Sequence, residues 1–343
     1  MAYKKGKGKM ARMKKMEPAA LTLTLATPSS AAGITRKSFI DLSQIASLVN
    51  RRFYRQGINW AVAGFKVSSL KAGTVTVGKL PTTWVMSNAW EKGFRSWQRM
   101  NEAAMTETES VRPRFLDFKI YANSDHHTAG FAGNLLPISF TGDTATAGEW
   151  ESSKYVLPKT DGTDDVNSRE ILAVGASYPG PSAATTLNAV SLIEGYAASR
   201  GLPNVTDPNT PTDARDAAGT APENWMQALF NEGTEQDDAV LTDLTSENNL
   251  APYPFENDGV NVDTMYPGGS NQLTGLEYHD FVNIYETNVT DGIGTQRLKG
   301  GMFPCGLIAL HWTPASASAN LVVQIDLVPG SHRGYLCEPM TDM

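Results

Sequence analysis

The segment LVVQIDLV, residues 321–328, alternates apolar and polar side chains along most of its length. Gln324 and Asp326 fall on one side of an extended chain. The other side is apolar: Leu321, Val323, Ile325 and Leu327. Successive side chains of a strand point to opposite faces, so this pattern predicts a half-buried strand of an antiparallel sheet.

Similar patterns recur along the chain. Residues 60–67 are almost entirely apolar, which is typical of a strand buried on both faces, and residues 73–85 begin by alternating Thr with Val. Further strand candidates are residues 115–121, 276–285 and 303–312. Thirty Gly and nineteen Pro favour many turns and short strands over a helical bundle. We therefore expect an all-β protein.

One helix is predicted between the early strands. Asn88 and Glu91 have the spacing of a capping box, which marks the start of a helix. An apolar stripe follows at helical spacing: Trp90, Phe94, Trp97 and Met100. We interpret this stripe as a packing face and not as a cofactor contact.

The beginning of the chain is strongly basic, although the chain as a whole is acidic. Residues 1–16 carry six Lys and one Arg with no acid, and residues 1–55 carry a net charge of +10. The whole chain carries −7, so residues 56–343 carry −17. Nucleic acid is the usual partner of such an arm, because each Lys or Arg at a phosphate releases condensed counterions. A solvated tail or a nuclear-import signal would have the same composition.

A second basic cluster, RRFYR at residues 51–55, interleaves cations with aromatic rings. Guanidinium groups along a nucleic-acid backbone and rings against its bases are a common way to hold a single strand. Alternatively, Phe53 and Tyr54 enter the core and the arginines lie at its rim. The candidate nucleic-acid-binding residues are Lys4, Lys5, Lys7, Lys9, Arg12, Lys14, Lys15, Arg36, Lys37, Arg51, Arg52, Phe53, Tyr54 and Arg55.

The composition divides the chain into four regions. Residues 1–56 are the basic arm and its connection, residues 57–150 hold the early strands, and residues 271–343 hold the last strands and a C-terminal tail. Residues 151–270 are predicted to be a loop-rich, acidic insertion that faces solvent. Between residues 203 and 263 there are thirteen Asp or Glu against one Arg.

Motifs associated with enzymes are incomplete. GTVTVGKL at residues 73–80 has the spacing of a phosphate-binding loop, but it ends in Leu where Mg²⁺ binding needs a hydroxyl. GASYPG at residues 175–180 is one residue too long for a nucleophile elbow. His126 and His127 would point to opposite faces of a strand, so we expect no shared metal. The sequence predicts neither an enzyme nor a metal or cofactor site, and carboxylates from distant loops remain an alternative.

The sequence also bears on membranes and cysteine chemistry. No segment approaches the ~20 continuous apolar residues that span a bilayer, so no membrane partner is expected. Residues 19–27, AALTLTLAT, are interrupted by Thr and lack the apolar run of a signal peptide. Cys305 lies in an apolar run and is expected to be a buried small side chain. Two cysteines cannot build a disulfide framework or a zinc site by themselves.

Three runs of residues resemble a known family. They are WVMSNAWEKGFRSWQRM (84–100), VRPRFLDFKIY (111–121) and HHTAGFAGNLLP (126–137). These runs are similar to segments of the capsid proteins of small circular, Rep-encoding single-stranded DNA viruses. The similarity covers about residues 57–137 and extends to the strands between 276 and 330, while the acidic insertion carries no matching motif.

The resemblance implies a single jelly roll, made of two packed four-stranded antiparallel sheets, with residues 57–150 as its first part and 271–343 as its last strands. It also implies a homo-oligomer of about 60 copies in an icosahedral T=1 shell around a single-stranded DNA genome. The basic arm would face the interior, and the protein would be found in the virion and, during assembly, in the host nucleus. No catalysis is implied, and the host receptor is not predicted.

The arm alone would not balance the charge of such a genome. Seven arm charges in each of about 60 copies neutralise about 420 phosphates, against a genome on the order of a few thousand nucleotides. The basic residues between 36 and 55, or small cations, would have to neutralise the rest.

Two other functions remain open. One is an extracellular β-sandwich module that binds carbohydrate or another ligand, with acidic loops holding Ca²⁺ and aromatic residues of 225–285 as its platform. The other is the coat of an RNA virus, because charge does not distinguish the two polymers.

Overall fold

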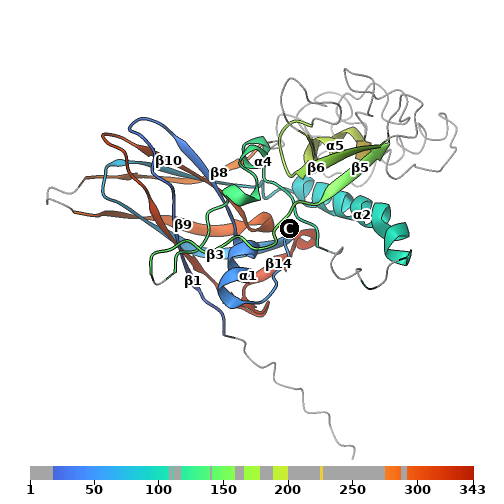
Figure 1. Cartoon of the computed structure of the whole chain (residues 1–343), viewed down its shortest axis with the longest axis horizontal. Coiled ribbons are helices and arrows are strands. Elements are labelled where there is room, and N and C mark those ends of the chain that lie inside the picture. Colours follow the sequence, from blue (N-terminus) through green and yellow to red (C-terminus); the bar gives the residue numbers. More distant parts are fainter. Residues whose placement is uncertain are drawn as a thin grey trace, which may run out of the picture.

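The computed structural model of the protein contains two antiparallel sheets that share one hydrophobic core (Figure 1). The structure describes residues 18–107, 110, 117–139, 141–158, 166–177, 188–199, 225–226, 275–286 and 292–343. The first sheet has the order β1 (Thr22–Ala26), β11 (Val322–Leu327), β3 (Ile58–Ser69) and β9 (Gly294–Phe303). The second has the order β2 (Arg36–Asp41), β10 (Leu307–Pro314), β4 (Gly73–Lys79) and β8 (Glu277–Ile284). The predicted all-β fold is confirmed.

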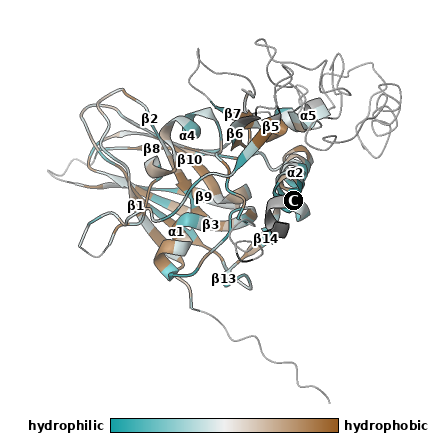
Figure 2. Cartoon of the chain, turned by 45° about the vertical axis from the view of Figure 1, so that its right-hand side comes forward, coloured by the Kyte–Doolittle hydropathy of each residue, from teal (hydrophilic) through white to brown (hydrophobic). Residues whose placement is uncertain are grey.

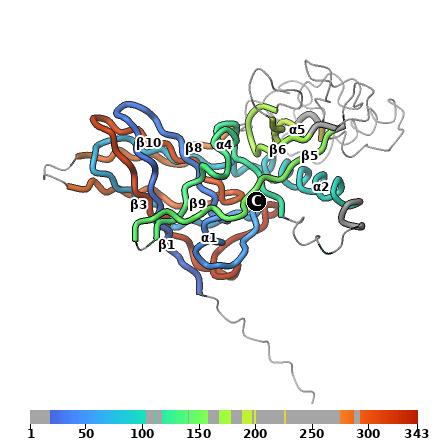
Figure 3. The backbone as a smooth tube through the Cα atoms, viewed as in Figure 1, coloured from blue at the N-terminus to red at the C-terminus, as the bar shows by residue number. Residues whose placement is uncertain are grey.

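The strands of these two sheets pair in a nested manner. β1 pairs with β11, β2 with β10, β3 with β9, and β4 with β8, all antiparallel. The early strands therefore pair with the late ones in reverse order, as in one long hairpin whose turn is the connection from residue 80 to 276. In Figure 3, strand β1, near the start of the chain, runs beside β11, near the end of the chain.

The alternation in residues 321–328 places β11 in the core, as predicted. Val323, Ile325 and Leu327 are at most 3% exposed and pack with residues of both sheets, whereas Gln324 and Asp326 face outward. Figure 2 shows hydrophobic and hydrophilic positions interleaved along the strands of the sandwich. Burial of one face of each sheet against the other holds the two layers together.

A second hydrophobic cluster lies against the outer face of β2 and β10. Phe39, Leu307 and Ala309 of these strands pack in one cluster with α2 (Trp84–Glu107). The same cluster includes the three-stranded sheet β5 (Lys154–Pro158), β6 (Val166–Leu172) and β7 (Ala189–Ser191), and helix α5 (Leu192–Ser199). These elements lie together beside the sandwich, at the right in Figure 1.

Shorter elements complete the described chain. Helix α1 (Leu42–Asn50) connects β2 to β3, and α4 (Ser124–Ala129) and η2 (Phe131–Gly133) lie between α2 and β5. The C-terminal part adds η3 (Pro304–Gly306), β12 (Pro329–Gly330), β13 (Gly334–Tyr335), β14 (Cys337–Pro339) and η4 (Met340–Asp342). β14 continues the line of β11 along the same edge of β3.

Three details differ from the sequence predictions. Residues 117–120 form no strand, and Tyr121 makes only an isolated bridge to Leu172; residues 115 and 116 lie outside the described part. The helix begins at Trp84 and not near Asn88, because the Thr83 hydroxyl accepts a hydrogen bond from the Met86 N–H. The stretch around residues 22–26, expected to be a connection, is strand β1.

The segment between the sandwich strands begins at residue 80, because β4 ends at Lys79. The insertion that we predicted from residue 151 is therefore only the later part of a longer connection between β4 and β8. Most of its acidic stretch, residues 200–224 and 227–274, lies outside the described residues.

The register of β11 can be tested with two neighbouring substitutions. Ile325→Ala should lower the free energy of unfolding by about 2–5 kcal/mol, because it removes buried methyl groups and leaves a cavity. Gln324→Ala, one position away on the outer face, should change it by less than about 0.5 kcal/mol. Chemical denaturation of both variants measures the difference. Equal effects of the two substitutions would contradict the assigned faces.

Candidate nucleic-acid interface

Four arginines gather at one end of the sandwich, where α1 ends. They are Arg51, Arg52, Arg55 and Arg333, and we call this region the arginine end. Arg51, Arg55 and Arg333 are exposed, and Arg52 is half-buried. Arg333 joins the others because its Nη1 donates to the carbonyl oxygen of Phe53 at 2.6 Å. Sequence reasoning missed Arg333, which lies about 280 residues from the others and is the only Lys or Arg after Lys299.

The basic arm joins the structure at this same end. The Pro18 carbonyl oxygen accepts from Arg52 Nη1 at 3.2 Å, and the Ala20 N–H donates to Asn50 Oδ1 at 3.0 Å. The Tyr335 hydroxyl donates to the Ala20 carbonyl at 2.7 Å and fixes the chain from its other side. The predicted arm residues (Lys4, Lys5, Lys7, Lys9, Arg12, Lys14 and Lys15) lie outside the described part of the chain. Their attachment point nevertheless lies beside the arginines.

Two of these arginines occupy backbone positions that favour glycine. Arg51 ends α1 with φ = 53°, and Arg333 has φ = 50°. A left-handed conformation costs a residue with a Cβ about 1–2 kcal/mol. Cys305 is the other non-glycine residue with positive φ in the described part of the chain. Backbone strain of this kind concentrates at functional sites, so the two positions support a role for their side chains.

Arg36 and Lys37 lie elsewhere. They begin β2, which runs roughly 17 Å before it reaches Asp41 and α1. Lys37 Nζ instead forms an ion pair with Asp125 of α4 at 2.6 Å. The structure therefore does not bring these two candidates together with the arginine end.

The two aromatic residues of the RRFYR cluster differ in burial. Tyr54 is 1% exposed, packs against Trp60 and Tyr335 in the core, and donates its hydroxyl proton to the Arg333 carbonyl. Its ring is not available to stack on a base, so its assignment as a nucleic-acid-binding residue is corrected. Phe53 is 47% exposed and stays a candidate.

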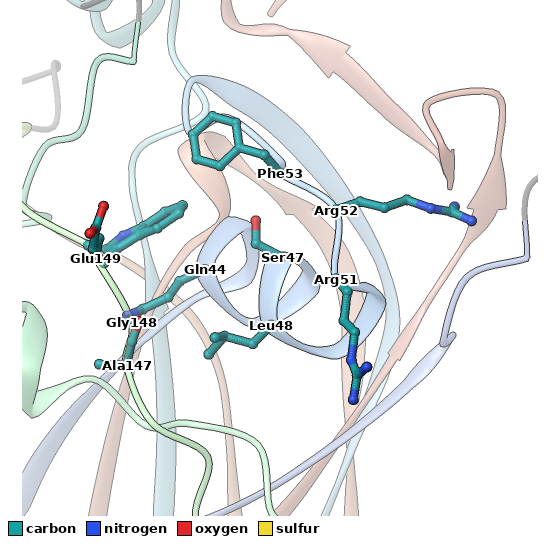
Figure 4. A pocket seen from close by; sticks show the side chains of 10 residues that line it. Gln44, Ser47, Leu48, Arg51, Arg52, Phe53, Ala147, Gly148 and Glu149 are labelled. Carbon is teal, nitrogen blue, oxygen red and sulfur yellow. Dashed lines mark hydrogen bonds between the residues drawn. The ribbon is translucent and has the colours of Figure 1, made fainter. Parts of the chain in front are cut away.

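Phe53 lies beside a pocket of about 250 Å³ between α1 and residues 147–150. Its ring centroid is 6.1 Å from that of Trp150, with the planes tilted by 54°. Lys119 Nζ lies 4.5 Å from the Trp150 ring centroid and 5.7 Å from that of Phe53, and it also pairs with Asp117. Figure 4 shows Gln44, Ser47 and Leu48 on the α1 side, with Ala147, Gly148 and Glu149 opposite.

The buried carboxylate of Asp41 fixes both walls of this pocket. Its Oδ1 accepts from the backbone N–H groups of Ser43 and Gln44 and so caps α1. Its Oδ2 accepts from Gln56 Nε2 at 2.9 Å and from Trp150 Nε1 at 3.0 Å. One fully buried side chain therefore joins the helix, the start of β3 and the opposite wall.

The hydrogen bonds continue from Gln44 to a buried histidine. Gln44 Oε1 accepts from Asn134 Nδ2, and Asn134 Oδ1 is 2.8 Å from His126 Nε2. His126 Nδ1 accepts from the Ala122 N–H, so Nε2 carries the proton of a neutral ring. We call the linked residues from Asp41 to His126 the Asp41 network. His126 and His127 lie on helix α4 and not on a strand, which corrects that prediction.

Burial shifts the pKa values of the two residues at the ends of the Asp41 network, Asp41 and His126. Desolvation raises the pKa of Asp41 to about 6, against the opposing effect of its four donors. Desolvation lowers the pKa of His126 to about 4, although its bond to Asn134 acts in the other direction. Each charged form is disfavoured in the folded protein.

The described residues contain no group of three or more His, Cys, Asp or Glu that could hold a metal ion. The phosphate-loop-like run at residues 73–80 is mainly strand β4, and Cys305 is fully buried, both as predicted. In the described part of the chain, no helix is long and apolar enough to cross a membrane.

Comparisons with known protein families, with curated proteins and with solved structures found no match.

The pKa shift of Asp41 predicts that the gap in free energy of unfolding between the wild type and Asp41→Asn depends on pH. A carboxyl whose pKa rises from 3.8 to about 6 on folding stabilises the fold below pH 4 and loses that contribution as pH rises through 6. Asn cannot titrate, so the free energy of unfolding of the wild type minus that of Asp41→Asn should shrink by about 2.4 kcal/mol between pH 4 and 7. The pKa shift of His126 has the opposite sign, but His126 is present in both proteins, so its contribution to the difference cancels. Urea denaturation at each pH measures this gap, and a constant gap would show that the four donors keep Asp41 charged throughout.

The strain at Arg51 can be measured separately. Arg51→Gly and Arg51→Ala both remove the guanidinium, but only Gly adopts φ = 53° without a penalty. We expect Arg51→Gly to be more stable than Arg51→Ala by about 1 kcal/mol in thermal or chemical unfolding. An Ala variant at least as stable as the Gly variant would exclude strain at this position.

Proposed function

We propose that this protein is a viral capsid protein. It self-assembles into an icosahedral shell of about 60 copies, T=1, and packages single-stranded DNA through its basic N-terminal arm. The proposal places the protein in the virion, with assembly in the host nucleus. The observation that carries it is the nested pairing of the sandwich strands together with the entry of the arm at the arginine end.

The strand order supports a single jelly roll. In that fold an antiparallel ribbon of eight strands wraps so that the first strand pairs with the last, the second with the seventh, and so on. β1, β2, β3 and β4 pair in this order with β11, β10, β9 and β8. The pairs then alternate between the two sheets, as the wrapped ribbon requires. Capsid subunits commonly use this architecture, although lectins and cupins use it as well.

The distribution of charge distinguishes a capsid role from those alternatives. An arm with seven cations and no acid in its first 16 residues enters beside Arg51, Arg52, Arg55 and Arg333. Together they form one cationic end on a chain with a formal charge of −7. A polyanion is the partner that such an end attracts, and association releases counterions from it.

Self-association agrees with the apolar surface along β8, an edge strand of its sheet. Tyr278 and Phe281 of β8 and the following Tyr285 are 60%, 49% and 69% exposed. Large aromatic residues gathered along one exposed edge are uncommon on monomers, and they are frequent at protein interfaces.

Removal of residues 1–16 should abolish most of the DNA binding. The salt dependence of affinity for single-stranded DNA should become shallower by about 5 in log K against log salt, because seven cations contribute about 0.7 each. Fluorescence anisotropy with a labelled oligonucleotide over a salt series measures both effects. A full-length variant with the seven arm cations replaced by Gln controls for length and should behave like the deletion. If the shortened protein binds DNA as tightly as the full chain at low salt, the arm does not package DNA.

A further inference from the structure

The pocket beside α1 has the size of a single nucleobase. Its volume of about 250 Å³ exceeds the ~150 Å³ that admits benzene. It falls below the ~300 Å³ at which pockets for drug-sized ligands begin. A purine or pyrimidine ring system lies between these two limits.

The pocket also offers a ring on which a base can stack. Phe53 is 47% exposed, whereas its neighbour Trp150 is 9% exposed and is held by the bond from its Nε1 to Asp41. Lys119 lies over both rings and steadies them. The Phe53 ring is thus an open surface on a fixed support, so little side-chain freedom would be lost when a base stacks on it.

The charges around the pocket favour a nucleotide over an apolar peptide side chain. Arg51 and Arg52 line its edge, and Figure 4 shows their side chains projecting away from the wall that Glu149 belongs to. A base inside the pocket would leave its flanking phosphates outside, where the guanidinium groups can reach them. The arm, which enters through the Pro18–Arg52 contact, would bring the strand to this position.

We propose, on the basis of the proposed function, that this pocket takes one unpaired base of the packaged strand. The base stacks on Phe53, and its neighbouring phosphates contact Arg51 and Arg52. Each ring of a nucleic acid has a π-face, so the site accepts any of the bases. It selects single strands over duplexes, because bases in a duplex are already stacked and paired.

An abasic oligonucleotide tests the pocket without changing the protein. The full-length protein should bind an oligothymidine of about ten nucleotides more tightly than a chain of abasic residues with the same number of phosphates. Phe53→Ala should weaken binding to the oligothymidine by ~5- to 150-fold and leave the affinity for the abasic chain unchanged. Fluorescence anisotropy at one fixed, low salt concentration measures all four affinities.

Leu70→Ala is the control. Leu70 is 52% exposed, close to the value for Phe53, but it follows Ser69, the last residue of β3, at the end of that strand far from the arginine end. This variant should change neither affinity. The inference is overturned if Phe53→Ala weakens both oligonucleotides equally, if it weakens neither, or if Leu70→Ala has the same effect. The failures are distinguishable, because a wild type that binds neither oligonucleotide at low salt would remove the proposed function itself.

Discussion

Nested antiparallel pairing is the constraint on which the rest of the structure depends. Because β1 pairs with β11 and β3 pairs with β9, the start of the described chain, the α1–β3 connection and the C-terminal segment all meet at one end of the sandwich. The arginine end exists only through this meeting, since Arg52 and Arg333 come from opposite parts of the sequence. The same pairing makes the β4–β8 connection the turn of a long hairpin. That turn can carry α2, α4 and the β5–β6–β7 sheet without any change in the register of the sandwich.

The Asp41 network holds this end in shape at an energetic cost. A buried carboxylate without a cation partner is unfavourable, yet its four donors would be left unsatisfied if an apolar residue replaced it. Through Trp150 and Gln44 the network positions both walls of the pocket, and through Asn134 it reaches His126, which stacks on Phe39 at 4.6 Å. The left-handed arginines add further strain nearby. Stability is thus lowered at the same end that carries the candidate interface, a combination typical of functional sites.

Local sequence patterns predicted those strands whose own residues carry the pattern of a buried face. Apolar runs and alternating patterns identified β3, β4, β8, β10 and β11, because each buries one face or both. These patterns missed β9, whose sequence GTQRLKGGMF mixes Gly and cations with few apolar residues, and whose place comes from pairing with β3. Residues 117–121 alternate like a strand, but Phe118 and Ile120 are buried under α2 without a strand partner beyond the Tyr121 bridge.

In the candidate site, the sequence identified Arg51, Arg52, Phe53 and Arg55. It could not find Arg333, Trp150 or the pocket, which depend on contacts between residues far apart in the chain, and it could not decide that Tyr54 is buried.

The central claim is that the cationic end of a jelly-roll subunit faces the nucleic acid inside a closed shell of identical copies. Cryo-electron microscopy of the recombinant protein mixed with single-stranded DNA tests this claim most directly. The account predicts closed icosahedral particles whose inner surface carries the α1 end of every subunit, with nucleic-acid density against Arg51, Arg52 and Arg333. Particles with that end on the outer surface, or a protein that stays monomeric with DNA present, would contradict it.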